Sequence, residues 1–200
     1  MKRSFDLAVA LAGLVITSPI LALSAIAVKL ESRGPAFFHG PRVGRHGRLF
    51  YIHKLRTMRP GADRAGPAVT AGDDPRVTRV GRFLRRTKLD ELPQLLNVVK
   101  GEMSLVGPRP EHPTYVERYT AEQRRLLAVR PGITGPAAIA FIDEEEQLRG
   151  GQSEKVYVEE VMPKKLALEL RYIDNASFRA DFEILLKTAA TVIRRPFAAS

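Results

Sequence analysis

The chain has 200 residues, of which 32 are Lys or Arg and 22 are Asp or Glu, so its formal net charge is +10. This length supports one domain with a core and is too short for two domains of ordinary size. The charge favours polyanionic partners, namely nucleic acid, anionic lipid or phosphorylated substrates, and the absence of cysteine excludes a disulfide framework and thiolate ligands.

An apolar segment opens the chain. From Leu7 to Val28 no residue is charged, and as a straight helix these residues would extend roughly 33 Å, enough to cross a bilayer. Ser18 and Pro19 stand near the middle of the segment. An interior proline removes a backbone hydrogen bond and clashes with the preceding turn, so we expect a kink near Ser18-Pro19, where a helix that returned to the same face of the membrane would be broken.

Basic residues flank the apolar segment on both sides. Lys2 and Arg3 precede it, and Lys29 and Arg33 follow it closely. The positive-inside rule puts both flanks in the cytoplasm, which a single straight crossing cannot achieve. The pattern therefore predicts a re-entrant hairpin, with residues 1–33 as a membrane anchor and residues 34–200 as a cytoplasmic region of the same domain.

Two other interpretations of the apolar segment stay open. A cleaved signal peptide would use Ala25-Ile26-Ala27 as its A-x-A site, although the apolar run exceeds the usual ~7 to 15 residues. An ordinary spanning helix, kinked by its proline, is the second alternative, because such prolines are tolerated in membranes.

The rest of the chain indicates an α+β, mainly helical, single domain. Residues 48–54 are aromatic and β-branched enough for a short strand, and residues 59–75 are rich in Gly, Pro, Ala and Asp, which predicts a mobile loop. Residues 143–153 predict a solvated loop or a frayed helix end. A last helix over 177–194 carries apolar residues at a helical spacing typical of core packing: Phe178, Phe182, Leu185, Ala189 and Val192.

Residues 77–86 predict an amphipathic helix. Val80, Phe83 and Leu84 form its apolar stripe, while arginines occupy the other faces. Such a helix can lie along anionic lipid headgroups at the membrane interface. A solvated basic face over an ordinary core stripe explains the same pattern equally well.

A further helix is expected from Glu91 to Lys100, ending at Gly101. Asp90 would then be its N-cap, and Pro93 would fall in the first turn, where its missing amide hydrogen costs little. Thr87 is an alternative N-cap, since Thr87-x-x-Asp90 has the spacing of a capping box.

Asp90 and Glu91 are the candidate catalytic residues. At a helix start close to arginines, both carboxyl groups are expected to be ionised, and an ionised aspartate can act as a nucleophile. Two adjacent carboxylates also suit Mg²⁺, which takes one or two protein carboxylates together with substrate phosphate oxygens. Considered alone, the pair is also explained by routine helix-start chemistry.

Basic residues elsewhere are candidates for phosphate binding. Arg109 lies between two prolines that stiffen its backbone, which suits bidentate binding of a phosphate, although a rigid turn with an exposed arginine fits the same pattern. Lys54, Arg56 and Thr57 follow the predicted strand and can supply further phosphate contacts. The four histidines show no metal-ligand spacing, and the glycines do not form a dinucleotide-binding motif.

Three segments together closely resemble a known family. These are KLRTM at 54–58, DPRVTRVGRFLRRTKLDELPQLLNVVKGEMSLVGPRPE at 74–111, and RPGITG at 130–135. They resemble the bacterial sugar transferases called monotopic phosphoglycosyl transferases, and the resemblance extends over nearly the whole chain, including the Ser-Pro break in the apolar segment.

The resemblance implies an activity at the cytoplasmic face of the bacterial inner membrane, with residues 34–200 as the catalytic region. A sugar-1-phosphate would pass from a nucleoside diphosphate sugar, usually a UDP-sugar, to a polyprenyl phosphate. Asp90 would be the nucleophile, forming a phosphosugar-enzyme intermediate and releasing UMP. Glu91 completes the acidic pair, and one or both carboxylates would hold Mg²⁺. Arg85, Arg109 and Lys54 match phosphate-binding positions.

The chain departs from the family pattern in two places. Gly40 stands where a glutamine is common, and Pro136-Ala137-Ala138 replaces a frequent Trp-Ala-Gln. Sugar, pathway and oligomeric state are therefore not predicted. The enzyme interpretation involves no nucleic acid. The alternative is a non-catalytic, membrane-anchored basic protein that binds anionic lipid or nucleic acid.

Overall fold

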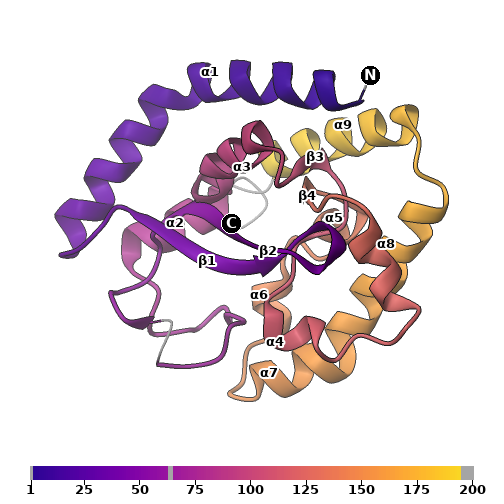
Figure 1. Ribbon diagram of the computed structural model, residues 1–200. Coiled ribbons are helices and arrows are strands. Elements are labelled where there is room, and N and C mark those ends of the chain that lie inside the picture. Colours follow the sequence, from indigo (N-terminus) through magenta and orange to yellow (C-terminus); the bar gives the residue numbers. More distant parts are fainter. Residues whose placement is uncertain (1, 63–64, 195–200) are drawn as a thin grey trace.

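The structure, a computed structural model, describes residues 2–62 and 65–194 (Figure 1). It is mainly helical with four short strands in the described ranges, so the predicted α+β, mainly helical, single domain is confirmed. The helices are α1 Lys2–Glu31, α2 Arg79–Thr87, α3 Leu95–Lys100, α4 Pro113–Val116, α5 Pro136–Ala140, α6 Glu144–Gln147, α7 Ser153–Val156, α8 Met162–Asp174 and α9 Phe178–Arg194. The strands are β1 Phe37–Val43, β2 Leu49–Leu55, β3 Ser104–Val106 and β4 Gly132–Thr134. Shorter helical turns are η1 Arg45–Gly47, η3 Leu89–Gln94, η4 Gln123–Ala128 and η5 Tyr157–Val161.

The long helix α1 bends but does not break. Figure 1 shows it running across the top of the molecule and then turning downward, and Pro19 lies inside the helix. Pro19 has no amide hydrogen to donate to the carbonyl of Val15, and the hydroxyl of Ser18 donates to that carbonyl instead, at 2.8 Å. The kink expected near Ser18-Pro19 agrees with this bend, whereas a full break of the helix there is wrong, because α1 continues through Pro19.

Both ends of α1 are fastened to the same folded body. At its start, Nη1 of Arg3 donates to the carbonyl of Val98 in the last turn of α3, at 2.6 Å. At its end, the carboxylate of Glu31 accepts from the backbone amide of Arg79 in the first turn of α2, at 2.7 Å. Both contacts are favoured by helix dipoles, because the cation Arg3 lies at the negative C-terminal end of α3 and the anion Glu31 lies at the positive N-terminal end of α2. Among the described residues, α1 is the one helix that is long and apolar enough to cross a membrane.

Two small sheets frame the interior. Strands β1 and β2 form an antiparallel hairpin in which His39 pairs with His53, which confirms the strand predicted over residues 48–54. Strands β3 and β4 form a short parallel pair. The segment 59–75 is irregular where the structure describes it, as predicted, and the guanidinium of Arg76 holds it by donating to the carboxylate of Asp74 and to the carbonyl of Ala62.

The helix predicted over 77–86 is confirmed as α2, with Thr78 as its N-cap. Of its apolar stripe, Leu84 and Val80 pack in a small core cluster with Val28 of α1, while Phe83 is exposed. Neither the interfacial helix nor the ordinary core helix describes α2 completely, because part of its apolar stripe packs in the core and Phe83 reaches the surface.

The segment after α2 differs from the prediction in one respect. Lys88 adopts a left-handed conformation with φ of 58°, and Asp90 then lies inside the 3₁₀ helix η3, followed by α3. The N-cap role expected of Asp90 is therefore wrong, and the alternative with Thr87 is wrong as well, because its hydroxyl donates back to Phe83 in α2 at 2.9 Å. Pro93 supplies no amide for an α-helical bond and disfavours α geometry in the preceding residue, which keeps this turn 3₁₀. The predicted end at Gly101 is confirmed, with φ of 84°.

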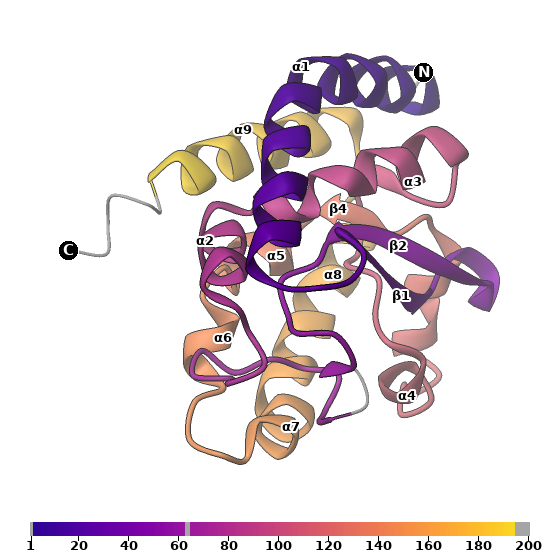
Figure 2. The same cartoon turned by 90° about the vertical axis from the view of Figure 1, so that its left-hand side faces the viewer.

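The last helix is confirmed as α9, but its expected core packing is wrong for three residues, because Phe178, Phe182 and Ala189 are exposed. Phe178 and Phe182 are 54% and 49% exposed. The side of α9 that faces the body carries Ile184 and Leu185, together with the buried Asp181. Helix α9 therefore has apolar residues on both sides, and only one side is covered. It lies beside the first half of α1 in both views (Figures 1 and 2).

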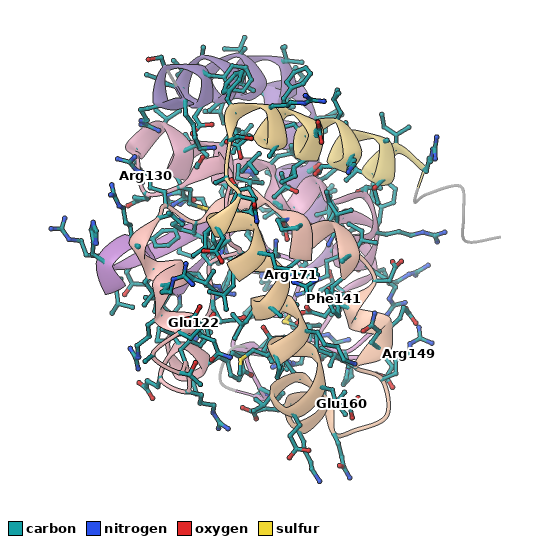
Figure 3. All side chains as sticks on the ribbon, turned by 90° about the vertical axis from the view of Figure 1, so that its right-hand side faces the viewer. Glu122, Arg130, Phe141, Arg149, Glu160 and Arg171 are labelled. Carbon is teal, nitrogen blue, oxygen red and sulfur yellow. The ribbon has the colours of Figure 1, made fainter. Side chains whose placement is uncertain are left out.

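A different surface is polar. The side of the molecule on which α8 runs exposes charged side chains over several elements, as Figure 3 shows: Glu122, Arg130, Arg149, Glu160 and Arg171. Segment 143–153 contributes the short helix α6 followed by irregular chain, close to the expected frayed helix end. The uncovered apolar surface of α1 and α9 is thus distinct from this charged side.

Candidate functional site

The five residues that the sequence nominated for catalysis and phosphate binding line one cleft of about 900 Å³. They come from four separate segments: the end of β2, helix α2, the 3₁₀ helix η3 and the loop after β3. These are Lys54, Arg85, Asp90, Glu91 and Arg109, called the dyad region below. Ser18 and Pro19, the predicted helix break, lie on α1 and are not among the residues that line the cleft.

Glu91 is held by two cations. Its Oε1 accepts from Nη2 of Arg109 at 2.7 Å and from Nζ of Lys54 at 3.0 Å, and Arg109 makes a second contact to Oε2 at 3.3 Å. Burial works to raise the pKa of Glu91, but the charges of Arg109 and Lys54 outweigh it and hold the pKa well below the usual glutamate value. Glu91 is therefore an ionised anchor that fixes both cations in the cleft.

Asp90 has the opposite environment. Its residue is 5% exposed, and its Oδ1 has no hydrogen-bond partner in the structure. Burial raises the pKa of Asp90 to about 6, with Lys54 opposing the rise and the negative charge of Glu91 adding to it. An ionised, poorly solvated oxygen without a partner is a good nucleophile and a good metal ligand.

Arg85 reaches the cleft from the last turn of α2. Its Nε donates to the hydroxyl of Thr57 at 2.8 Å, and its Nη1 pairs with the carboxylate of Glu145 in α6 at 2.9 Å. Sequence reasoning had named Thr57 as a possible phosphate contact and had missed Glu145. No sequence signal distinguishes Glu145, because it is one of three consecutive glutamates.

Arg56, which was also named as a possible phosphate contact, has a different role. It is buried, and it donates to the carbonyls of Ser32 and Arg33, at 2.9 and 2.7 Å, just beyond the end of α1. Arg56 thus fastens the end of α1 to the segment that also carries Lys54 and Thr57.

The loop that carries Arg109 is mounted tightly. A Cβ on Gly132 would lie 2.1 Å from the backbone nitrogen of Gly107, so β4 approaches the loop as closely as only glycine permits.

Behind the loop is a small pocket of about 30 Å³, called the rear pocket, which is lined in part by Pro108, Arg109 and Glu169. Both carboxylate oxygens of Glu169 lack a hydrogen-bond partner. Burial raises the pKa of Glu169 to about 7, and the nearby charges of Lys165 and Arg109 oppose the rise.

A second polar group extends the cleft beyond the dyad region. The hydroxyl of Tyr157 donates to the carboxylate of Glu111, Nζ of Lys165 donates to that hydroxyl at 3.3 Å, and Lys165 pairs with Glu144 at 2.5 Å. These residues were missed from the sequence, because Tyr157 and Lys165 lie in helices whose pattern indicates only core packing.

The residues present fit a magnesium ion that relies on substrate oxygens. No group of three or more His, Asp or Glu side chains gathers as a metal cluster in the part of the chain that the structure describes. Mg²⁺ needs only one or two protein carboxylates when phosphate oxygens and water complete its shell. Asp90, with its unpartnered Oδ1, offers one such carboxylate, whereas the oxygens of Glu91 accept from Arg109 and Lys54.

With this geometry established, the chain can be compared with known proteins. The sequence profile of the family described as bacterial sugar transferase matches residues 1–195. The chain belongs to the bacterial sugar transferase family. The resemblance drawn from the sequence is thereby confirmed, and this sugar transferase is an enzyme rather than a binding protein.

Several relatives of this sugar transferase carry names that specify a reaction. A UDP-glucose:undecaprenyl-phosphate glucose-1-phosphate transferase of Caulobacter vibrioides is 42% identical over 96% of this chain and 69% of its own length. A UDP-N-acetylgalactosamine-undecaprenyl-phosphate N-acetylgalactosaminephosphotransferase of Aeromonas hydrophila is 35% identical over 96% of this chain and 44% of its length. An undecaprenyl-phosphate galactose phosphotransferase of Salmonella typhimurium is 36% identical over 98% of this chain and 41% of its length. The three names share the lipid and differ in the sugar.

Proposed function

We propose that this sugar transferase moves a sugar-1-phosphate from a UDP-sugar to a polyprenyl phosphate through a covalent intermediate on Asp90, as the first membrane step of glycoconjugate or polysaccharide assembly. The single observation that carries the proposal is the unequal environment of two adjacent carboxylates. The carboxylate oxygens of Glu91 accept hydrogen bonds from Arg109 and Lys54, while Oδ1 of Asp90 is buried without a hydrogen-bond partner in the same cleft.

In the first step, a carboxylate oxygen of Asp90 attacks the phosphorus atom that bears the sugar. A bond forms between that oxygen and phosphorus, and the bond from phosphorus to the oxygen bridging the two phosphates breaks, so UMP leaves with that oxygen. Glu91 holds Lys54 and Arg109 beside the site, and its charge opposes the lowering of the Lys54 pKa by burial. The remaining N–H groups of the two cations can stabilise the charge that develops on the phosphate oxygens.

In the second step, a phosphate oxygen of the polyprenyl phosphate attacks the same phosphorus atom. The bond between phosphorus and Asp90 breaks, which regenerates the carboxylate and yields a polyprenyl diphosphate sugar. Both steps place phosphates next to carboxylates, so the site needs the cations that the dyad region gathers. Asp90 would hold Mg²⁺, with Glu91 as a second ligand only if it released Arg109 or Lys54, and the ion when bound offsets the negative charge of the diphosphate. Chelation of Mg²⁺ is expected to stop UMP release, and added Mg²⁺ to restore it.

We also propose that α1 enters the membrane and returns to the cytoplasmic face. The contacts of Arg3 with α3 and of Glu31 with α2 support this topology, because both ends of the helix bind one folded body that lies on one side of the membrane. Single cysteines at Ser4 and Ser32 should both react with an impermeant reagent from the cytoplasmic side only. Labelling of position 4 from outside would instead establish a spanning helix.

The function is tested by incubating the purified protein with Mg²⁺, polyprenyl phosphate and a panel of UDP-sugars, and measuring UMP. We expect UMP release with one or a few sugars, together with a lipid-linked diphosphate product. Absence of UMP across a broad panel, alongside salt-sensitive binding of nucleic acid or anionic lipid, would favour the non-catalytic alternative.

A further inference from the structure

The cleft has two ends of different chemistry, with the dyad region between them. Toward segment 59–76 and α8, its lining carries charged and hydrogen-bonding groups among small apolar residues of that segment, and these groups include Arg76, Glu111, His112 and Lys165. Toward α9, its lining is mainly apolar. This part, called the apolar arm, carries no charged residue and is formed by Leu92, Leu95, Ala138, Ile139 and Val192 together with Thr188 and Thr191. A substrate with a charged head and a long apolar tail fits such a cleft with its head at the dyad region.

The two walls of the apolar arm are firmly placed. On one side, the hydroxyl groups of Thr188 in α9 and Thr134 in β4 are hydrogen-bonded at 2.7 Å, which holds α9 over α5. On the other side, Leu95 follows η3 directly, so this wall is continuous with Asp90 and Glu91. The arm therefore leads from the catalytic carboxylates to the space beneath α9.

The outer surroundings of the arm are apolar too. A Cβ on Gly13 would lie 3.1 Å from a methyl group of Leu95, so the middle of α1 packs against this wall. On α9, exposed apolar residues recur at i, i+4, i+8 and i+15, a spacing that gathers them on one face: Phe178, Phe182, Leu186 and Ile193. Figure 2 shows α9 extending beside α1 along the same edge of the molecule. If lipid chains cover these exposed faces, an arm that opens between the helices is reached from the membrane.

We propose that the apolar arm binds the isoprenoid chain of the acceptor, entering from the membrane between α9 and α3, while the polar end of the cleft binds the nucleotide of the donor. This inference rests on the proposed function and adds to it the separate positions of the two substrates. The nucleotide is charged and hydrogen-bonding and matches the polar end, whereas an isoprenoid chain gains free energy only from an apolar lining.

Two tryptophan substitutions test the arm. Ala138→Trp and Val192→Trp fill it from α5 and from α9, and each has a matched control on the same helix. The controls are Ala140→Trp and Ala190→Trp, because both alanines are exposed and lie outside the cleft lining. The first half-reaction is measured as the burst of UMP without acceptor, and the second as transfer to long-chain and short-chain polyprenyl phosphates.

Both lining variants should keep the UMP burst while kcat/KM for the long-chain acceptor falls by about tenfold or more, and the loss should be smaller for the short-chain acceptor. The control variants should match the wild-type enzyme in both half-reactions. The proposal is overturned if the lining variants transfer as well as the controls. It is also overturned if the burst falls together with transfer, since the donor would then occupy the arm.

A binding measurement separates this proposal from the proposed function. The chain has no cysteine, so Val192→Cys and Ala190→Cys each provide one site for a benzophenone label. Capture of polyprenyl phosphate at position 192, reduced by unlabelled polyprenyl phosphate and absent at position 190, supports the arm even if no UDP-sugar yields UMP. Absence of competed capture at position 192 rejects the arm, whatever the enzyme does with its donor.

Discussion

The dyad region and the rear pocket both bury carboxylates, but only in the dyad region do cations form hydrogen bonds with one of them. Arg109 and Lys54 bind Glu91 directly and keep its pKa low. Glu169 in the rear pocket lies on the other side of the Arg109 loop, has no hydrogen-bond partner, and has its pKa raised to about 7 by burial. Asp90 is intermediate, with a pKa near 6, because Lys54 opposes the effect of its burial.

The difference shows that burial alone does not define a reactive carboxylate. A buried carboxyl group without cations becomes neutral near physiological pH, whereas the same group with cations stays ionised. Asp90 combines an unpartnered oxygen with nearby positive charge, which is what a nucleophile toward phosphorus needs. Glu169 lies behind the Arg109 loop and does not line the cleft, so we assign it no part in the reaction.

The largest expected effect comes from Asp90→Asn. The amide has nearly the volume of the carboxylate but is not a nucleophile, so turnover should fall by about 10³-fold or more while the fold is kept. UMP release measures the activity, and mass spectrometry of the protein after exposure to donor measures the covalent phosphosugar adduct. Asp73→Asn is the matched control, because Asp73 is exposed and lies outside the cleft lining. If Asp90→Asn retained most of its UMP release, Asp90 would not be the nucleophile.

A smaller effect is expected in the pH dependence of the first half-reaction. Asp90 must be ionised to attack, so kcat/KM for UMP release should decrease as the pH falls through about 6. Lys54 lowers the pKa of Asp90, so Lys54→Met should move this inflection to higher pH in addition to slowing the reaction. The measurement is the burst rate between about pH 5 and 9. If the inflection occurred at the same pH in both proteins, it would not report the ionisation of Asp90.

The smallest effect is expected at Glu169 and concerns stability. The pKa of Glu169 is 4.5 for a free glutamate and about 7 in the folded protein. Between these two pH values the folded state binds more protons than the unfolded state, so stability is lost as the pH rises. Glu169→Gln stays neutral and should raise the free energy of unfolding by up to about 3 kcal/mol at pH 8 and by much less at pH 5. Denaturant titrations at the two pH values measure this, with the exposed Glu160→Gln as control. Equal changes at both pH values would contradict the assignment.

Local sequence patterns predicted several elements closely. Helix α2, the end of α3 at Gly101 and strand β2 follow from periodicity and from glycine at a helix end, because these depend on neighbouring residues. The pairing of Asp90 with Glu91 and the candidates Lys54, Arg85 and Arg109 came from motifs, and the structure brings all five into one cleft.

Other features were not predictable from local pattern. The 3₁₀ geometry at Asp90 depends on how Pro93 is accommodated, and the exposure of Phe178 depends on which side of α9 meets the body. An apolar stripe indicates that one face of a helix avoids water, but it does not indicate whether protein or lipid covers that face.

The sequence by itself determined the family, the acidic pair and the apolar helix, because these are properties of residue types at short spacing. Only the tertiary structure decided that the charge of Glu91 is balanced by cations while Asp90 keeps an oxygen without a hydrogen-bond partner. That outcome depends on Arg109 and Lys54, which come from distant segments of the chain. Electrostatic interactions depend on distance in space, and the chain sets that distance only once it has folded.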